Sequence, residues 1–423
     1  MGIAQRNLTP HRLGLVEEPV ESLTVERSSR HSPRLGSHRS LSSSRPVRWS
    51  RQAKLGFVGI SVILIATACG SAGVEPLPTV PQSQPSSNAA PQSPPSPNVT
   101  APQSAPSANV TASARPSVQQ LAGEVSDARA VKHLQALQKI ADENGGNRAA
   151  GTPGYDASVK YVVDVLRKAG FKPSTPTFES SGGDGDGDGG SGPQRNVIAQ
   201  TSTGNPSQVV MIGAHLDSVE DGPGIVDNGS GVATLLEIAT QLGADPSVQN
   251  TVRFGFFGDE ESGAVGSTGY LEGLSADDRN KIKLYLNVDM VASPNGGYLV
   301  QGGKGRDEEE AGPPGSATIG RVLADQLTKT GVASPEIIEF VGDDESPFIE
   351  AGIPVGGAES GDDEEKTAKQ AKAWGGQAGE VYDRCYHEAC DTIDNINRDL
   401  LDHYLRAIAG TLAHFATSTE QLR

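Results

Sequence analysis

The stretch VVMIGAHLDSVEDGPGIVDNGSGVATLLEIATQL (209–242) decides the fold, because it holds one complete strand–loop–helix unit. Its apolar start, 209–214, is typical of a buried strand, and residues 232–241 are typical of a helix. Three further apolar runs predict more strands: NVIAQ (196–200), VRFGFF (252–257) and LYLNV (284–288). Strands that alternate with helices predict an α/β fold, a three-layer α/β/α sandwich around a mixed, mostly parallel sheet.

Apolar residues at helical spacing predict three more helices around this sheet. The first begins with Asp127 as its cap and stops before Gly145, and the second runs over 155–166 and ends at Gly170. The third covers 399–416. Its apolar face consists of Leu401, Leu405, Ile408, Leu412 and Phe415.

Charge divides the chain into parts of different character. The net charge is -17, but residues 1–54 hold ten Arg or Lys against four Glu, and residues 55–117 are neutral. Residues 118–423 therefore carry -23. A body this acidic has no surplus of cations to neutralise phosphates, which excludes nucleic acid as a partner.

Residues 55–69, LGFVGISVILIATAC, predict an export signal, because a short apolar run follows basic residues. The apolar run is shorter than the about 20 residues of a spanning helix. Ala66-Thr67-Ala68-Cys69 resembles the bacterial lipobox, with Ala where Leu is usual. This resemblance implies a lipid on Cys69 that anchors an exported protein to the bacterial membrane; plain secretion with a free cysteine is the alternative.

The remaining N-terminal parts are not expected to fold. Residues 1–54 form a basic extension too long for an export signal, which is either disordered or not translated, with a start near Val47 as one hypothesis. Residues 70–117 are rich in Pro, Ser, Asn and Gln and predict a disordered tether. Residues 118–423 are expected to form one catalytic domain that is monomeric.

A Gly/Asp-rich segment, 180–192, interrupts a predicted hairpin or crossover. Asp184, Asp186 and Asp188 resemble the start of a calcium loop, but Arg195 stands where the loop needs Glu. Calcium is therefore possible but unsupported, and a surface loop is the preferred interpretation.

Acidic and histidine side chains follow the predicted strands at their carboxyl ends, where functional groups of open α/β sheets gather. Two histidines and three carboxylates suit two divalent cations with one shared carboxylate, and a spare glutamate can act as a base. Any one of these residues alone would be an ordinary cap, turn or surface residue; the combination predicts a metal site. The residues are His215, Asp217, Asp227, Glu260, Glu261, Asp289 and His387.

Residues 118–423 resemble the secreted bacterial double-zinc aminopeptidases of the streptomycete leucine-aminopeptidase type, in metallopeptidase clan MH. The resemblance rests on these motifs: NGGNRAAGTPGY (144–155), GAHLDSV (213–219), GIVDNGSG (224–231), GDEESGAVGS (258–267), YLNVDM (285–290), GIPVGG (352–357) and YDRCYHEACDTIDNIN (382–397). It implies two Zn²⁺ ions, with His215 and Asp289 on one, Glu261 and His387 on the other, and Asp227 between them.

The same resemblance implies the catalytic roles. Glu260 would be the general base toward a metal-bridging water, Asp217 would orient His215, and Tyr386 would hydrogen-bond the oxyanion. Cys385 and Cys390 would form a disulfide. The implied substrates are peptides with free N-termini, with Leu-like or other apolar first residues favoured.

One segment departs from the family pattern. Relatives often carry an Arg and a His before Pro347-Phe348, whereas this chain has GDDES (342–346). The acidic edge formed by Asp343, Asp344 and Glu345 suggests a preference for basic N-terminal residues. The alternatives are another amide hydrolase or cyclising aminoacyl transferase of the clan, or a metal-binding lipoprotein that has lost turnover.

Overall fold

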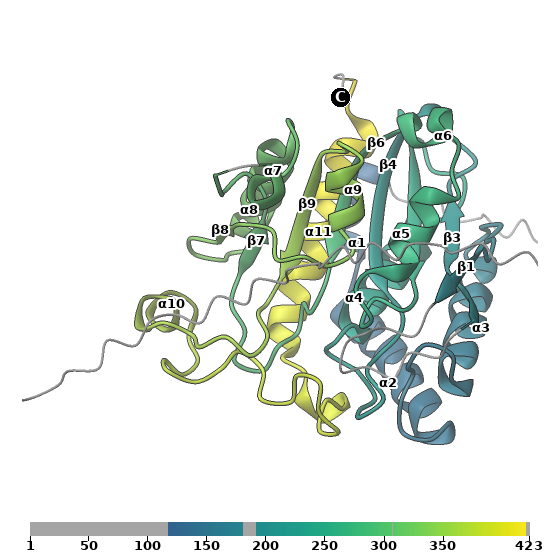
Figure 1. Cartoon of the computed structure of the whole chain (residues 1–423). Coiled ribbons are helices and arrows are strands. Elements are labelled where there is room, and N and C mark those ends of the chain that lie inside the picture. The colour runs from purple at the N-terminus through teal and green to yellow at the C-terminus, as the bar shows by residue number, and fades with distance from the viewer. Residues whose placement is uncertain (1–116, 181–191, 307, 420–423) are drawn as a thin grey trace, which may run out of the picture. The chain divides into compact units, whose positions relative to one another are not determined.

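The computed structural model describes residues 117–180, 192–306 and 308–419 (Figure 1). The predicted basic extension, export signal and tether up to residue 116 lie outside these ranges, and so does Cys69. Within the described ranges, none of the helices has the length and apolar character needed to cross a membrane.

A seven-stranded mixed sheet forms the centre of the described part, in the order β3-β5-β4-β6-β9-β7-β8. The strands β5, β4, β6 and β9 are parallel to one another, β3 pairs antiparallel with β5, and β7 pairs antiparallel with β9 and parallel with β8. This confirms the predicted mixed, mostly parallel sheet. The strands are β3 Val197–Gln200, β4 Asn205–His215, β5 Asn250–Phe257, β6 Ile282–Val288, β7 Leu299–Gln301, β8 Glu336–Ile338 and β9 Val355–Glu359.

Helices cover both faces of the sheet, as the three-layer prediction requires (Figure 1). The larger core lies under α2, α3, α4, α8 and α11, and a smaller aromatic core lies on the other face under α5 and α9. The helices are α2 Asp127–Glu143, α3 Pro153–Lys168, α4 Gly229–Leu242, α5 Val265–Glu272, α6 Ala276–Lys281, α8 Ser316–Lys329, α9 Ser346–Glu350, α10 Ala368–Trp374 and α11 Arg398–Thr417, with short turns α1 Leu121–Glu124 and α7 Glu308–Ala311.

The last helix confirms its predicted apolar face. All five residues expected on that face are buried, and the helix packs along the larger core. Its side-chain cap is Asn397, which accepts a hydrogen bond from the amide of Leu400. Helix α4 is buried on nearly every side, because it lies between the sheet and α2 and α3.

The start of α2 differs from its prediction. Ser126, not Asp127, occupies the cap position, and Asp127 in the first helical turn forms an ion pair with Arg398 at the start of α11. A carboxylate is favourable in the first turn as well as at the cap, so the sequence did not separate these positions. Val131 and Ile140 are half-buried rather than buried, because the neighbouring alanines face the core more directly.

The segment before β3 forms a hairpin, which is one of the two predicted alternatives. Strands β1 Thr177–Ser180 and β2 Gly192–Arg195 pair antiparallel around residues 181–191. These residues, which hold the predicted surface loop with Asp184, Asp186 and Asp188, lie outside the described ranges. Arg195 forms an ion pair with Asp156 of α3.

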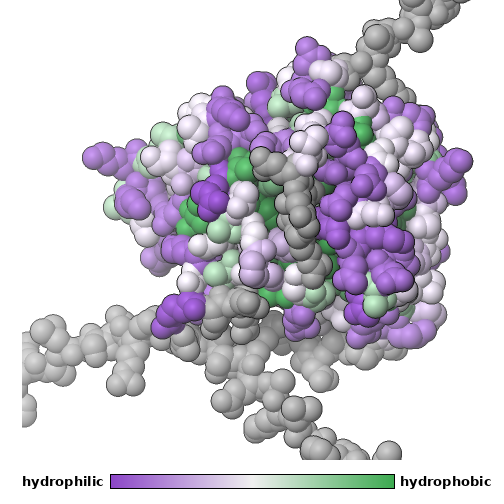
Figure 2. Space-filling model, turned by 90° about the horizontal axis from the view of Figure 1, so that it is seen from above, coloured by the Kyte–Doolittle hydropathy of each residue, from purple (hydrophilic) through white to green (hydrophobic). Residues whose placement is uncertain are grey.

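The two ends of the parallel strands face opposite sides of the molecule. Figure 2 shows the side on which β4 and β6 begin and α11 ends, with hydrophilic side chains over much of it. The carboxyl ends of the parallel strands lie at the opposite edge. There β4 ends at His215, β6 ends just before Asp289, and β9 ends at Glu359. The expected functional groups therefore meet at one edge of the sheet.

Candidate metal centre

Two groups of potential ligands share one carboxylate at this edge. The strand cluster consists of His215, Asp227 and Asp289, and the loop cluster consists of Asp227, Glu261 and His387. Within each cluster the ligand atoms all lie within 4.8 Å of one another. All five residues expected from the sequence to bind metal are therefore brought together.

Asp227 lies between the two histidines and reaches each with a different oxygen. His215 Nε2 is 3.1 Å from Asp227 Oδ1, and His387 Nε2 is 3.3 Å from Asp227 Oδ2. On the outer sides, His215 Nε2 is 3.4 Å from Asp289 Oδ2, and His387 Nε2 is 3.0 Å from Glu261 Oε2. This arrangement has the shape that two cations with one bridging carboxylate require.

The donor atoms fit zinc. Imidazole nitrogen and carboxylate oxygen are common zinc ligands, and among the described residues the buried atoms Glu261 Oε1 and Asp289 Oδ1 have no hydrogen-bond partner. Buried polar atoms without a partner are costly, so they indicate that a ligand belongs there. Burial opposes a charge on His215, yet the surrounding carboxylates, Asp289 above all, raise its pKa well above the usual range. The centre is thus built to hold positive charge.

Asp217 stands behind His215, on the side away from Asp227. Asp217 Oδ1 is 3.6 Å from His215 Nδ1, and both side chains are buried. The other oxygen, Oδ2, accepts a hydrogen bond from the backbone amide of Glu261 at 3.4 Å. Asp217 therefore lies beside residues on both sides of the centre, although its Oδ1 and His215 Nδ1 make no hydrogen bond at this distance.

The backbone at Asp227 is held by a residue that the sequence reasoning missed. Asp391 accepts hydrogen bonds from the amides of Val226 and Asp227, at 2.8 and 3.0 Å. Its position directly after the Cys385–Cys390 loop was the available signal. The carboxyl-terminal motif thus fixes the residue shared by the two clusters.

Arg148 was also not predicted as a site residue, although it lies in the motif NGGNRAAGTPGY (144–155). Its guanidinium is completely buried and donates to the carbonyls of Leu216, Pro223 and Gly224. These carbonyls belong to the segment that joins His215 to Asp227. Since a buried guanidinium needs several acceptors, Arg148 and this segment fix one another's conformation.

Cys385 and Cys390 form a disulfide, as the resemblance implied. The loop that it closes carries Tyr386 and His387, whose rings stack with their centroids 3.9 Å apart. His387 has a φ of +58°, a left-handed conformation that few non-glycine residues adopt. Burial, with Asp227 and Glu261 nearby, raises the pKa of Tyr386 well above its usual range, so its hydroxyl keeps its proton.

Glu260 and Glu261 follow β5 in a turn that begins at Gly258. Asn196 accepts a hydrogen bond from the amide of Gly258 at 3.0 Å and so ties this turn to the hairpin side of the sheet. Burial raises the pKa of the Glu260 carboxyl well above its usual range. A carboxyl group with a raised pKa is suited to accept and return a proton near neutral pH.

A cavity opens onto the centre and contains acidic residues beyond the ligands. Asp343, Glu359 and Asp362 line it with the two clusters, Glu260 and Tyr386. The predicted acidic edge is wrong for two of its three residues. Asp344 and Glu345 are buried, because Glu345 accepts hydrogen bonds from the amides of Gly342 and Asp343 and closes the turn inward.

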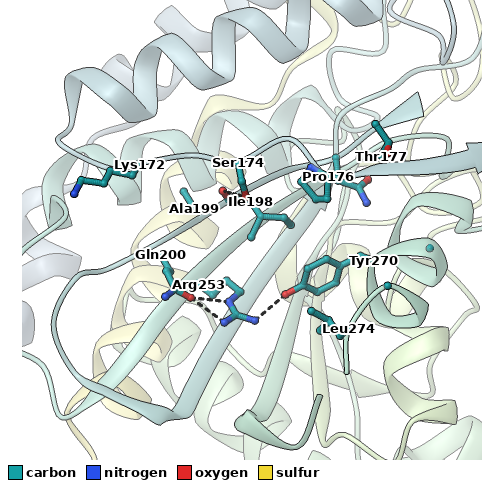
Figure 3. Close-up of a pocket in the computed structure, with 13 residues that line it drawn as sticks. Lys172, Ser174, Pro176, Thr177, Ile198, Ala199, Gln200, Arg253, Tyr270 and Leu274 are labelled. Carbon is teal, nitrogen blue, oxygen red and sulfur yellow. Dashed lines mark hydrogen bonds between the residues drawn. The ribbon is translucent and has the colours of Figure 1, made fainter. Parts of the chain in front are cut away.

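A second cavity, of about 450 Å³, lies far from these residues along β3 (Figure 3). In its floor Arg253 donates hydrogen bonds to Gln200 and to the hydroxyl of Tyr270, so its charge is already solvated by the protein. Among the described residues that line it, none is a histidine, cysteine or carboxylate. Its lining therefore lacks the side chains that usually bind metal ions.

Sequence comparisons identify relatives over the region that forms this centre. The model of peptidase family M28 matches residues 196–412. Leupeptin-inactivating enzyme 1 of Streptomyces exfoliatus is 44% identical over 283 residues, which are 66% of this chain and 59% of that protein. An aminopeptidase of Pseudomonas aeruginosa is 42% identical over 265 residues, 63% of this chain and 45% of that protein. The chain thus spans about half the length of these relatives.

A third relative and two solved structures complete the comparison. The probable lipoprotein aminopeptidase LpqL of Mycobacterium tuberculosis is 44% identical over 65% of this chain and 56% of that protein. A zinc aminopeptidase from Bacillus subtilis aligns with a TM-score of 0.56 at 16% identity, covering 70% of this chain and 96% of that one. A glutaminyl cyclase from Porphyromonas gingivalis aligns with a TM-score of 0.50 at 21% identity, covering 69% and 98%. The fold is therefore shared by a hydrolase and a cyclase.

Proposed function

The chain belongs to peptidase family M28, and on this premise we propose that it is a zinc-dependent aminopeptidase that removes N-terminal residues from peptides. The curated relatives named aminopeptidase and leucine aminopeptidase support this activity. They also support Leu-like first residues as test substrates. The observation that carries the proposal is the pair of ligand clusters joined by Asp227 with Glu260 beside them.

In this proposal His215 and Asp289 hold one zinc ion, Glu261 and His387 hold the other, and Asp227 contacts both. Ions bound there would supply Lewis-acid chemistry, which would polarise the scissile carbonyl and acidify a water molecule. The shared carboxylate and the short distances on either side of it support each assignment.

The chain's own residues supply the proton transfers. Glu260 lines the cavity, where it takes a proton from the attacking water and returns it to the leaving amine. The Tyr386 hydroxyl, which keeps its proton, donates a hydrogen bond to the oxygen that becomes negative. Asp217 holds the His215 ring in one orientation and does not touch the substrate.

The test is zinc content together with hydrolysis of leucine p-nitroanilide by the full exported chain and by Glu260→Gln. We expect two zinc ions in both proteins, turnover that a chelator abolishes, and a loss in kcat of about 10²- to 10⁴-fold in the variant. Glu272→Gln on the exposed face of α5 is the control and should match the wild type.

The possible results separate the alternatives. Two zinc ions without hydrolysis of any aminoacyl amide would contradict the aminopeptidase. Cyclisation of an N-terminal glutaminyl peptide by such a protein would favour the transferase, and inactivity in both assays would favour a metal-binding protein.

We propose in addition that the protein acts outside the cytoplasm, anchored by a lipid on Cys69. The relative named a lipoprotein supports export and anchoring, and the Cys385–Cys390 disulfide supports an oxidising compartment. In a bacterial host, Cys69→Ser should move the enzyme from the membrane fraction to the soluble fraction and abolish labelling by a fatty acid. Unchanged membrane association and labelling would contradict the anchor.

A further inference from the structure

Besides Glu260, the proposed base, three carboxylates outside the ligand clusters line the cavity: Asp343, Glu359 and Asp362. They come from separate places in the chain. Asp343 lies in the turn before α9, Glu359 is the last residue of β9, and Asp362 lies in the loop that follows. The fold therefore gathers them at the same edge as the metal ligands.

Glu359 is held in a fixed orientation with one oxygen free. It is 8% exposed, and its Oε2 accepts a hydrogen bond from Gln301 Nε2 at 2.8 Å. Among the described residues nothing hydrogen-bonds its Oε1, and the residue faces the cavity. A buried carboxylate that keeps a free oxygen toward a cavity is prepared for a donor on a ligand.

The other two carboxylates are positioned by backbone contacts. Asp362 accepts a hydrogen bond from the amide of Glu364 at 3.2 Å. The turn of Asp343 is closed by Glu345, which in turn accepts a hydrogen bond from Asn287 of β6 at 3.3 Å. Both residues thus line the cavity from loops that are tied down.

Within the described part of the chain, no cationic side chain pairs with this group. Asp343, Glu359 and Asp362 form no ion pair there, whereas the carboxylates of the two clusters have the proposed zinc ions. Burial, with Asp362 nearby, raises the pKa of Glu359 to about 8, so near neutral pH a cation beside Glu359 would displace its proton. A cation that entered the cavity would be favoured beside such groups.

We propose that this cavity receives the positively charged side chain of a lysine or arginine at the substrate's N-terminus, with Glu359 as the main partner. The inference rests on the proposed aminopeptidase function and specifies its substrate class. The substrate's free α-ammonium carries one positive charge. A basic side chain would carry a second, which the group of three carboxylates would bind. Met290 and Val341, which also line the cavity, offer apolar contact to the methylene stem, so uncharged aliphatic residues are accepted as well.

The test compares lysine and norleucine p-nitroanilides, which share an unbranched four-carbon stem and differ at its end in a charged ammonium. For the zinc-loaded wild type we expect kcat/KM for lysine to exceed that for norleucine about tenfold, the size of one favourable charge contact in a partly buried site. Glu359→Gln should lower kcat/KM for lysine about tenfold more than for norleucine. Asp363→Asn, an exposed neighbour outside the cavity, should leave both values unchanged.

Two results would overturn the proposal. One is a lysine-to-norleucine ratio that stays the same in Glu359→Gln and Asp362→Asn. The other is an equal loss for both substrates with unchanged zinc content, which would place Glu359 on the α-ammonium instead.

Failure of the proposed function would look different. If the wild type hydrolysed neither substrate, calorimetric binding of free lysine and norleucine would still test the cavity. Tighter binding of lysine that Glu359→Gln removes would support it, and equal binding of the two amino acids would overturn it.

Discussion

The two ligand clusters differ in how the fold holds them. In the strand cluster, His215 ends β4 and Asp289 directly follows β6, and the His215 side chain is 1% exposed. In the loop cluster, His387 lies in a disulfide-closed loop in a left-handed conformation, and its side chain is 41% exposed. One cluster is therefore fixed by the sheet, and the other by covalent and hydrogen-bond ties between loops.

The sheet and the loops therefore contribute differently to the stability of one metal centre. Ligands at strand ends are positioned by the same ladder that forms the core, so their geometry is as stable as the fold. The geometry of ligands on a loop depends on a few local contacts, and solvent reaches these ligands more easily. The clusters should then respond differently to mutation, acid and reduction, except at the residue that they share.

The largest effect is expected from Asp227→Ala, which removes that shared residue. Both clusters lose an anionic ligand, so we expect almost no zinc in the purified variant and a loss of turnover of at least about 10³-fold. Metal analysis after gel filtration measures this. A variant that kept two zinc ions per chain would show that the clusters are independent.

A smaller and one-sided effect is expected from Asp217→Asn. Losing the carboxylate behind His215 should weaken zinc binding at the strand cluster about 10- to 100-fold. Competition with a chelator should show two zinc ions of now unequal affinity. If both affinities fell equally, Asp217 would act on the whole centre through its contact with the amide of Glu261.

Lowering the pH should weaken zinc binding at the loop cluster. Burial opposes protonation of His387, but Asp227 and Glu261 outweigh it and raise its pKa to about 10 without metal. Below that pH a zinc ion must displace the His387 proton, so affinity should fall about tenfold for each unit of decreasing pH. Asp289→Ala isolates the loop cluster for this titration between pH 7 and pH 9. A zinc affinity independent of pH would contradict the assigned proton.

The smallest effect is expected from removing the disulfide by the double substitution Cys385→Ser and Cys390→Ser. The bridge closes a short loop, so it contributes about 2 kcal/mol of loop ordering. Because Asp391 still holds the adjoining chain, we expect zinc affinity to fall less than about tenfold and only at the loop cluster. A loss of zinc from both clusters would mean that the disulfide supports the whole centre.

The sequence predicted the parts of this centre that follow long apolar runs. Strands β4, β5 and β6 are continuous apolar segments, so their carboxyl ends and the ligands there could be placed from the order of residues alone. The first residue of α2 was harder to predict, because Ser126 and Asp127 can both cap the start of a helix. Fold class and ligand residues were thus predictable together.

The acidic side of the cavity could not be predicted in the same way. Strand β9 is a five-residue segment with two glycines, which has too little apolar character to be recognised as a strand, so Glu359 was not placed at its end. Asp344 and Glu345 were expected to form an acidic edge with Asp343, and only tertiary contacts such as the hydrogen bond from Asn287 to Glu345 turn them inward. The role of Asp391 depends on hydrogen bonds to residues 164 and 165 positions away, which no local pattern reveals.

The hydrogen bonds that Asp391 accepts from the amides of Val226 and Asp227 also determine when the metal centre can form. A growing chain that ended before residue 385 would contain the strand cluster and Glu261 but neither His387 nor Asp391. Its metal centre would be half built, however well the sheet had formed. The two clusters are therefore complete only after the segment that carries His387 and Asp391 has folded back onto the first half of the domain.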